Sequence, residues 1–494
     1  MEEKSTLRIG KKAFLTSVGI LLILVIIAGI LTVVVPSGKF QRTTTDGREV
    51  IVKDSYRRIE KPYYPVYRWI TAPIEVLWGP DSVTVIGIIL VLLLIGASFV
   101  ILEETGIIEF LMNNIVEKYG DNKYKLLNIL ILFFMFFGAT LGIFDELIAL
   151  VPIVVTLSHY MGWDSLVGLG ASALAAGFGF TAAVFNPFTI AIAQEIAELP
   201  LFSGIGFRAV IFVMVYLILS RFILNYAKKI EKNPELSLVY EEDRFIKERI
   251  EKGREHSKGE VNLKYTEDDK VKSNKAMKVL SVFLILICLL VVAGFFLPEL
   301  SSYSLLIVAF LFFVGAFVSG TVRVKGTNME GKLLKFAVKG FKSIAPAILL
   351  IMLAMSIKYI VTEGGIMDTI LNYSCIKIQG LNSYLAVFFI YMLVFFLDFF
   401  ISSGSAKAFL VMPIIVPLAD LTGITRQLVV QAYCFGDGFS NMLFPTNASL
   451  MIALGFTVVG YPKWFKWTWK LQLLMLILTV VALFIGLKIN YGPF

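Results

Sequence analysis

The sequence predicts an all-α polytopic membrane protein with two inverted repeats, each containing a re-entrant helical hairpin and a broken transmembrane helix. Composition is the first observation behind this prediction. Of the 494 residues, 57% are hydrophobic and 17% are charged, against about 45–50% and about 25% in soluble domains. The second observation is the length of the apolar runs, which at about 20 residues fits spanning helices rather than barrel strands. The third is an internal duplication.

The duplication pairs the stretch Gly138–Pro187 with the stretch that begins at Phe399. Upstream, after a two-residue shift, Glu104–Ile107 faces Glu363–Ile366. Matching interrupted hydrophobic segments in the two halves of a membrane protein are typical of a transporter's binding site. The gap-free alignment brings identical residues together at Pro152 and Pro413, Ile153 and Ile414, Val155 and Val416, Leu157 and Leu418, Gly162 and Gly423, Gly177–Phe178 and Gly438–Phe439, and Asn186 and Asn447.

Composition also limits the function classes. The net charge of +8 is explained by Lys and Arg that flank spans on the cytoplasmic side, so we expect no nucleic-acid partner. The odd set of Cys288, Cys375 and Cys434 gives no disulfide framework, and His159 and His256 give no zinc spacing. The sequence contains no GxxxxGK[ST], so ATP coupling is unsupported.

Residues 1–82 form the first predicted unit. Basic residues of the tail stay in the cytoplasm, and Phe14–Val35 is an uncleaved span because it is too long for a signal peptide. The loop 36–82 is expected outside, with the aromatic part around Trp69 and Trp78 lying in the membrane interface. This loop holds eight Lys and Arg residues, which conflicts with the charge rule, and we follow the rest of the chain.

Residues 83–226 form the first predicted repeat. Its hairpin enters and leaves on one side, and arms that cross fully would leave the later topology unchanged. The broken span is interrupted at Gly177–Pro187, which indicates two half-helices. The predicted elements are the span Val83–Leu102, a charged connector over 103–122, the hairpin Leu126–Tyr160, the broken span Leu166–Leu199 and the span Ile205–Leu224.

Two segments separate the repeats. Residues 227–275 carry many charges of both signs and predict a mobile cytoplasmic linker. Residues 276–343 contain the spans Val279–Phe296 and Leu305–Val322, followed by a basic inside loop from Lys325 to Lys342 whose lysines have amphipathic spacing.

Residues 344–494 form the second predicted repeat. Loop charges place it in the opposite orientation to the first, with the N-terminus cytoplasmic and the C-terminus outside a multi-pass inner or plasma membrane. The predicted elements are the outward span Ile348–Val361, the hairpin Leu385–Leu421, the broken span Gln427–Val459 and the last span Leu471–Leu487.

Paired interruptions predict a transport site. Unpaired backbone groups in a bilayer cost several kcal/mol each unless they are buried in protein or hydrated, so such breaks persist where they face a cavity. Half-helix N-termini suit carboxylates and unwound carbonyls suit Na⁺. The ionisable Glu146, Lys407 and Asp437 should therefore face a cavity or one another. Contact with substrate or a proton is one interpretation, and a buried ion pair that only holds the halves in register is the other.

The motifs resemble the anaerobic C4-dicarboxylate carrier (DcuC/YfcC-like) family of the ion transporter superfamily. The similarity runs from the start of the chain, where the first span ends in VVVPSGKF, to Trp469, and it is most specific at SSGSAKAFLVMPIIVPLADLTG, GDGFSN and PTNA. It implies that substrate and coupling ion bind where hairpin tips and broken helices meet. It also implies dicarboxylates, arginine- or ornithine-type amino acids or peptide-like acids as substrates. An acid at one tip and Lys407 at the other would suit a zwitterion as well.

These arguments together give the candidate site. No cofactor is expected, and Na⁺ or H⁺ is the candidate coupling ion. The partners expected are a small-molecule substrate and the lipid bilayer, and a homodimer stays open. The predicted substrate-binding residues are Glu146, Asn186, Ser403, Ser405, Lys407, Asp437 and Asn447. The predicted coupling-ion residues are Asp145, Thr181, Asn186, Ser402, Asn441 and Asn447.

The favoured function is a secondary active transporter, a symporter or exchanger working by alternating access, rather than an enzyme. The alternative is an intramembrane aspartyl protease that uses Asp398 and Asp437, because Gly436-Asp437-Gly438 partly resembles such an active site. A passive channel is disfavoured by the inverted repeat.

Overall fold

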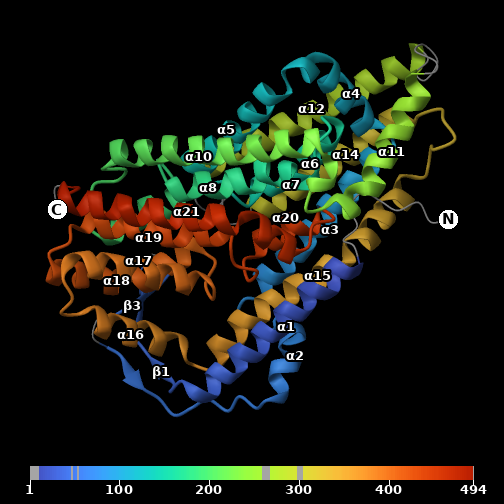
Figure 1. The fold of residues 1–494 in the computed structure, drawn as a ribbon. Coiled ribbons are helices and arrows are strands. Elements are labelled where there is room, and N and C mark those ends of the chain that lie inside the picture. The colour runs from blue at the N-terminus through green and yellow to red at the C-terminus, as the bar shows by residue number, and fades with distance from the viewer. Residues whose placement is uncertain (1–10, 46–47, 53–54, 259–266, 297–303, 493–494) are drawn as a thin grey trace.

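The computed structural model describes residues 11–45, 48–52, 55–258, 267–296 and 304–492. Ten helices in these ranges are long and apolar enough to cross a membrane, which confirms the predicted all-helical membrane protein (Figure 1). The strands described are short antiparallel pairs in the loop after the first span, β1 (Gly38–Lys39) with β4 (Arg57–Arg58) and β2 (Arg42–Thr45) with β3 (Arg48–Ile51).

The two halves contain the same order of elements, except that the broken span starts with two helices in the first half and with one in the second. The first half consists of α3 (Ser82–Glu104), α4 (Ile107–Tyr119), α5 (Lys123–Leu141), α6 (Val151–Tyr160), α7 (Ser165–Leu169), α8 (Ala175–Ala182), α9 (Ile192–Ile196) and α10 (Ile205–Lys232). The second consists of α15 (Leu333–Glu363), α16 (Met367–Ile378), α17 (Ser383–Asp398), α18 (Gly404–Thr422), α19 (Arg426–Asn441), α20 (Ala448–Gly455) and α21 (Tyr461–Lys488). Outside them lie α1 (Lys11–Val34), α2 (Tyr67–Glu75), α11 (Tyr240–Lys258), α12 (Glu267–Phe296) and α14 (Ser304–Val324).

Backbone geometry supports the alignment of the halves. Gly106 before α4 and Gly365 before α16 both have positive φ, at 75° and 66°. Gly162 after α6 and Gly423 after α18 also match, at 89° and 68°. L-residues adopt this region only at an energetic cost, so glycine is favoured at the same turn in each half.

Helices α3 and α15 pack antiparallel, as an inverted repeat requires. One end of the pair is joined by Lys339–Glu104 at 2.6 Å and the other by Lys358–Asp81 at 2.7 Å. Close approach is allowed by Gly340, because a Cβ there would lie 2.5 Å from the Cα of Ala97. Small residues at a helix contact let the backbones pack tightly in a membrane.

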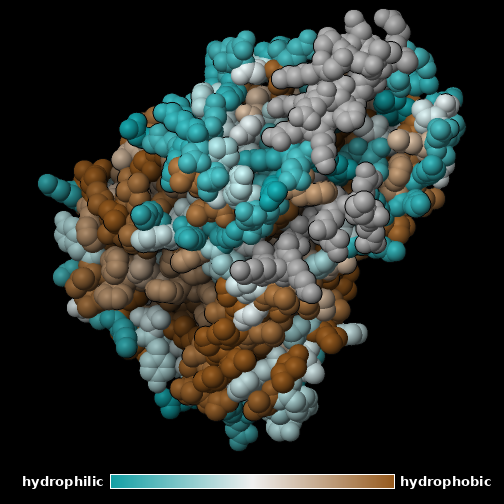
Figure 2. Space-filling view, turned by 45° about the vertical axis from the view of Figure 1, so that its right-hand side comes forward, coloured by the Kyte–Doolittle hydropathy of each residue, from teal (hydrophilic) through white to brown (hydrophobic). Residues whose placement is uncertain are grey.

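Ion pairs are found at two ends of the molecule, which we call the linker end, where α11 lies, and the β-hairpin end, where the strands lie. At the linker end, Arg249 pairs with Glu103 and Lys463 with Glu242, both at 2.6 Å. At the β-hairpin end, defined by β1–β4, Arg42 pairs with Asp368 at 2.8 Å. Hydrophilic residues gather over the upper part of the molecule, where α4 and α11 lie, and hydrophobic residues form a broad band below and beside it (Figure 2).

The eight basic residues of the predicted external loop are partly explained by their partners. Arg42 pairs with Asp368, and Arg68 lies 2.6 Å from Glu75 and 3.8 Å from Glu363. The acids at 363 and 368 come from the second half of the chain, so a loop-by-loop count of Lys and Arg misses them. Neutralised by these carboxylates, Arg42 and Arg68 carry little information about sidedness.

Two connecting segments that the sequence predicts as a linker and a loop contain helices. The described part of the predicted mobile linker contains α11, and Asp243 on this helix is fully buried. The predicted loop 325–342 is helical from Leu333 onward. Leu333, Ala337 and Gly340 are buried, whereas Lys335 is exposed and Lys339 is half-buried against Glu104, which is the spacing of an amphipathic helix.

We predict that Asp243→Ala destabilises the linker end. The Asp243 carboxylate accepts hydrogen bonds from the Ser165 amide at 2.7 Å and from its hydroxyl at 2.6 Å. Leaving buried donors unpaired costs about 1–3 kcal/mol, so the apparent melting temperature in detergent should fall. Glu248→Ala on the same helix removes an exposed i,i+4 pair with Arg244 and should change it little. Equal shifts would contradict the prediction.

Stability should also depend on pH through Asp243. Burial raises the pKa of this carboxyl to about 6, whereas an unfolded Asp titrates near about 3.9. The folded state therefore binds the proton more tightly, so its stability increases as the pH falls from above 6 towards 4. Melting curves at both ends of this range should show a larger gain for the native protein than for Asp243→Asn.

Candidate functional site

Four interruptions of the helices surround the centre of the molecule, at the positions that the sequence predicted. In the first half, α5 ends at Leu141 before the helical turn η2 (Glu146–Leu150). The break after α8 ends where η4 (Pro187–Ala191) begins. In the second half the corresponding gaps lie between α17 and α18 and between α19 and α20.

The first amide groups after three of the breaks are capped by predicted site residues. The side chain of Asn186 accepts from the Phe188 amide at 2.9 Å, and that of Asn447 accepts from the Leu450 amide at 3.0 Å. Ser403 accepts from the Ala406 amide at 3.4 Å. Asn and Ser are preferred N-caps because their oxygens replace the missing carbonyl partners. Asn186 and Asn447, which align in the duplication, thus each cap the helix that follows the break in their half.

Carbonyl groups before the breaks are bound by side chains of corresponding helices. Arg208 of α10 is fully buried, and its guanidinium donates at 3.3 Å to the carbonyl of Val184 inside the break and at 3.0 Å to the carbonyl of Phe202 in the loop after α9. In the second half Trp464 of α21 donates to the Met442 carbonyl at 2.9 Å. Carbonyls of the two unwound segments therefore bind different donors, a guanidinium in the first half and an indole in the second. Such donors are needed because a bilayer contains no water to bind these carbonyls.

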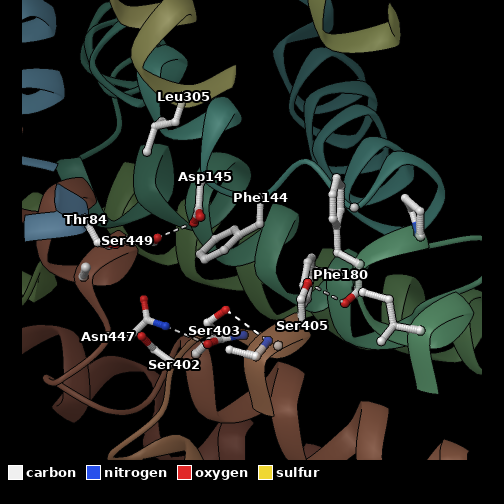
Figure 3. Close-up of a pocket in the computed structure, with 18 of the residues that line it drawn as sticks. Thr84, Phe144, Asp145, Phe180, Leu305, Ser402, Ser403, Ser405, Asn447 and Ser449 are labelled. Carbon is white, nitrogen blue, oxygen red and sulfur yellow. Dashed lines mark hydrogen bonds between the residues drawn. The ribbon is translucent and has the colours of Figure 1, made fainter. Parts of the chain in front are cut away.

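Each hairpin tip contacts the broken helix of the other half. Ser449 of α20 donates to Asp145 at the first tip, and Ser405 at the second tip donates to the Phe188 carbonyl at 3.0 Å (Figure 3). Ser304 at the start of α14 donates to Glu146. The centre is thus closed by a reciprocal pair of contacts between the halves.

A cavity of about 950 Å³ lies between these contacts (Figure 3). Carboxylates on its lining come from Asp145, Glu146 and Glu195, and no Lys, Arg or His is among the described residues that line it. The aromatic rings of Phe144, Phe180, Phe188 and Phe409 form part of its walls. Its electrostatic character therefore favours a positively charged ligand with some apolar surface.

Beside the cavity lies a buried ion cluster made of Asp398, Lys407 and Asp437. Lys407 and Asp437 are predicted substrate-binding residues, and Asp398 belongs to the protease alternative. The ammonium group of Lys407 donates to Asp437 at 2.8 Å and also to Asp398. All three side chains are completely buried. The cluster joins α17, α18 and α19 of the second half, so it does not connect the two halves.

The structure brings most of the predicted residues together. The cavity lining includes Asp145, Glu146, Ser402, Ser403, Ser405, Asn441 and Asn447. Lys407 and Asp437 are not on the lining and pair with each other. Asn186 lies behind Gly142, and the Thr181 hydroxyl donates to the Gly177 carbonyl at 2.8 Å. Both side chains therefore support the break after α8.

Sequence reasoning did not identify several residues of the site. Ser449 follows Asn447 by two positions, and Glu195 follows the first break, so polarity near a break was a usable signal for both. Ser304 lies at the end of a span and Arg208 within one. The partner of Ser304, Glu146, is distant in sequence, and Arg208 binds backbone carbonyls, which no residue type indicates.

Interrupted helices that enclose a polar cavity in a membrane protein define the class of secondary transporters. Comparison with known proteins then gives the family. The profile of the C4-dicarboxylate anaerobic carrier (DcuC) family matches residues 14–488, and the chain belongs to this family.

Two curated relatives cover most of the chain. A protein of Escherichia coli (strain K12) named "Putative basic amino acid antiporter YfcC" is 32% identical over 481 residues, which are 90% of this chain and 91% of that protein. An uncharacterized protein of Haemophilus influenzae is 25% identical over 425 residues, 85% of this chain and 78% of that protein.

Two solved structures are also similar. The YdaH transporter of Alcanivorax borkumensis is 16% identical with a TM-score of 0.40, covering 97% of this chain and 100% of that chain. MtrF of Neisseria gonorrhoeae, from a class of antimetabolite efflux pumps, is 18% identical with a TM-score of 0.41, covering 96% and 95%.

Membership of a transporter family shows that the chain is not an enzyme, so the aspartyl protease alternative was wrong. The geometry agrees, since Asp398 and Asp437 both bind Lys407 and neither lines the cavity.

We predict that Gly142→Ala abolishes transport. Gly142 has a φ of +68°, and a Cβ there would lie 2.3 Å from Oδ1 of Asn186. The added Cβ would therefore displace the Asn186 side chain, which caps the helix start after the α8 break. Gly106→Ala is the matched control, because Gly106 has a φ of +75° with no atom within 4 Å of the added Cβ. Both variants share the backbone strain of about 1 kcal/mol. Uptake that falls equally in both would contradict the prediction.

Proposed function

We propose that the protein transports a cationic amino-acid-like solute across the membrane by alternating access, by ion coupling or exchange. The observation that supports this most is the cavity, whose described lining contains three carboxylates and no basic side chain. A dicarboxylate would meet Asp145 and Glu146 without a compensating cation there, and like charges at close range repel.

The two sides of the cavity suit the two ends of such a solute. Asp145 and Glu146 would pair with its ammonium or guanidinium groups. On the opposite side, the hydroxyls of Ser402, Ser403 and Ser405 lie at the start of α18. The positive end of this helix dipole favours the solute's carboxylate.

The name of the Escherichia coli relative, "Putative basic amino acid antiporter YfcC", points to the same substrate class. The family description points to C4-dicarboxylates. We favour the amino acid because the charges of this cavity, rather than a family label, decide which ligand is stabilised here.

The inverted-repeat arrangement supplies the proposed mechanism. Beyond the tips, the lining continues to Thr84 at the start of α3, Glu195 at the end of α9 and Leu305 at the start of α14. These ends lie towards the β-hairpin end. With the linker end cytoplasmic, as its basic residues favour, this conformation would expose the site to the outside. Exchange of the reciprocal tip contacts would then expose it to the cytoplasm.

The test is uptake of labelled arginine, lysine and succinate into proteoliposomes preloaded with unlabelled arginine. We expect uptake of the basic amino acids and none of succinate. Glu146→Gln should reduce arginine uptake about tenfold or more, since a charge-assisted hydrogen bond contributes about 1.5–3 kcal/mol.

Glu117→Gln is the control, because Glu117 is an exposed acid on α4 that does not line the cavity. It should transport like the native protein. Succinate uptake without arginine uptake would overturn the proposed substrate class.

A further inference from the structure

We propose that the Asp398–Lys407–Asp437 cluster binds the coupling proton, so that a proton moves opposite to the cationic substrate. This inference rests on the proposed transport of a cationic solute. It concerns a site separate from the cavity that holds that solute.

The cluster is short of one positive charge. Two carboxylates share one ammonium group, and Oδ2 of Asp398 and Oδ2 of Asp437 are buried without a hydrogen-bond partner among the described residues. An uncompensated charge in a buried site is strongly disfavoured, and two neighbouring carboxylates hold a proton more readily than one. A proton on one free oxygen neutralises the cluster.

A proton fits this site better than a metal ion. Neither free oxygen is reached by solvent, and all three side chains have no exposed surface. Within the described ranges, no group of three or more His, Cys, Asp or Glu residues is placed to hold a metal. Hard cations need several oxygen ligands arranged around them.

The cluster is close enough to the cavity to interact electrostatically with a bound substrate. Gly404 lines the cavity, and a Cβ on it would lie 2.9 Å from Oδ2 of Asp437. Tyr433 of α19 donates to the Gly404 carbonyl from the side of the cluster. A substrate cation and a bound proton are thus separated by one layer of backbone. Each raises the free energy of the other in this low-dielectric region, so binding of one favours release of the other.

The other charged and titratable groups near the cluster are few. Tyr433 and Cys434 of α19 interact electrostatically with Asp437, and Arg208 of α10 interacts with Cys434. Neither Tyr433 nor Cys434 is a carboxylate or a base at neutral pH. The carboxyls of Asp398 and Asp437 are therefore the groups that exchange the proton.

The experiment uses the full-length protein in proteoliposomes that contain a pH-sensitive dye. Addition of arginine outside should raise the internal pH as substrate enters and protons leave. Asp437→Asn keeps the shape of the side chain and leaves a neutral Asp398–Lys407 pair, so we expect it to fold. It should retain arginine–arginine exchange at half the native rate or more, and lose substrate-driven proton movement.

Asp420→Asn is the matched control, since Asp420 is an exposed acid of α18 that pairs with Arg426. It should move protons like the native protein. Internal acidification, uptake driven by Na⁺ alone, or unchanged proton movement in Asp437→Asn would each overturn the proposal. Loss of exchange as well would assign Asp437 a structural role and overturn it too.

Proton binding is also measured without substrate, which separates this proposal from the proposed substrate class. Infrared difference spectra of the purified protein between acid and alkaline pH should contain the band of a buried protonated carboxyl. The band should disappear in Asp437→Asn or in Asp398→Asn and persist in Asp420→Asn. Its absence from the native protein would overturn the cluster as a proton site, whatever solute is transported.

Discussion

Backbone hydrogen bonding in hydrocarbon is the constraint on which the rest of this structure depends. Four interruptions leave backbone amides and carbonyls without partners in their own helices. The hydrocarbon of the bilayer supplies no water to bind them. Asn186, Ser403 and Asn447 bind amides on one side of the breaks. Arg208 and Trp464 bind carbonyls on the other. Because dedicated side chains hold the unwound segments, the cavity between them is preformed and does not have to be organised by the ligand.

The contacts between hairpin tips and broken helices explain how two halves can share one site. Asp145 with Ser449, and Ser405 with the Phe188 carbonyl, join each half to the other at equivalent places. These bonds are few and lie at the cavity wall, whereas the tie between α3 and α15 has ion pairs at both ends. Movement that exposes the cavity to the opposite side therefore has less to break at the tips than at the scaffold.

The duplication made the breaks predictable, because the aligned Asn186 and Asn447 mark the same interruption in each half. Their chemistry was less predictable, since a polar residue at a break can bind a ligand or cap a helix, and the sequence does not separate these roles. Lys407 illustrates a further limit. Its charge indicated a polar surrounding, but only packing shows that α17 and α19 bring two carboxylates to it. The order of α11 likewise depends on Asp243 meeting Ser165, a contact that hydrophilic composition obscures.

In our proposal, the separation of two acidic sites gives each a different partner, the cationic solute at the cavity and the proton at the cluster. Asp145 and Glu146 face a cavity large enough for a solute, so a cation of that size can neutralise them. Asp398 and Asp437 lie behind Gly404 with no exposed surface, so their unpaired charge is available only to something much smaller. A glycine at this wall keeps the two sites close, because any side chain would push Asp437 away from the cavity. Communication between substrate and proton then requires no moving relay, since the electric field across one backbone layer is enough.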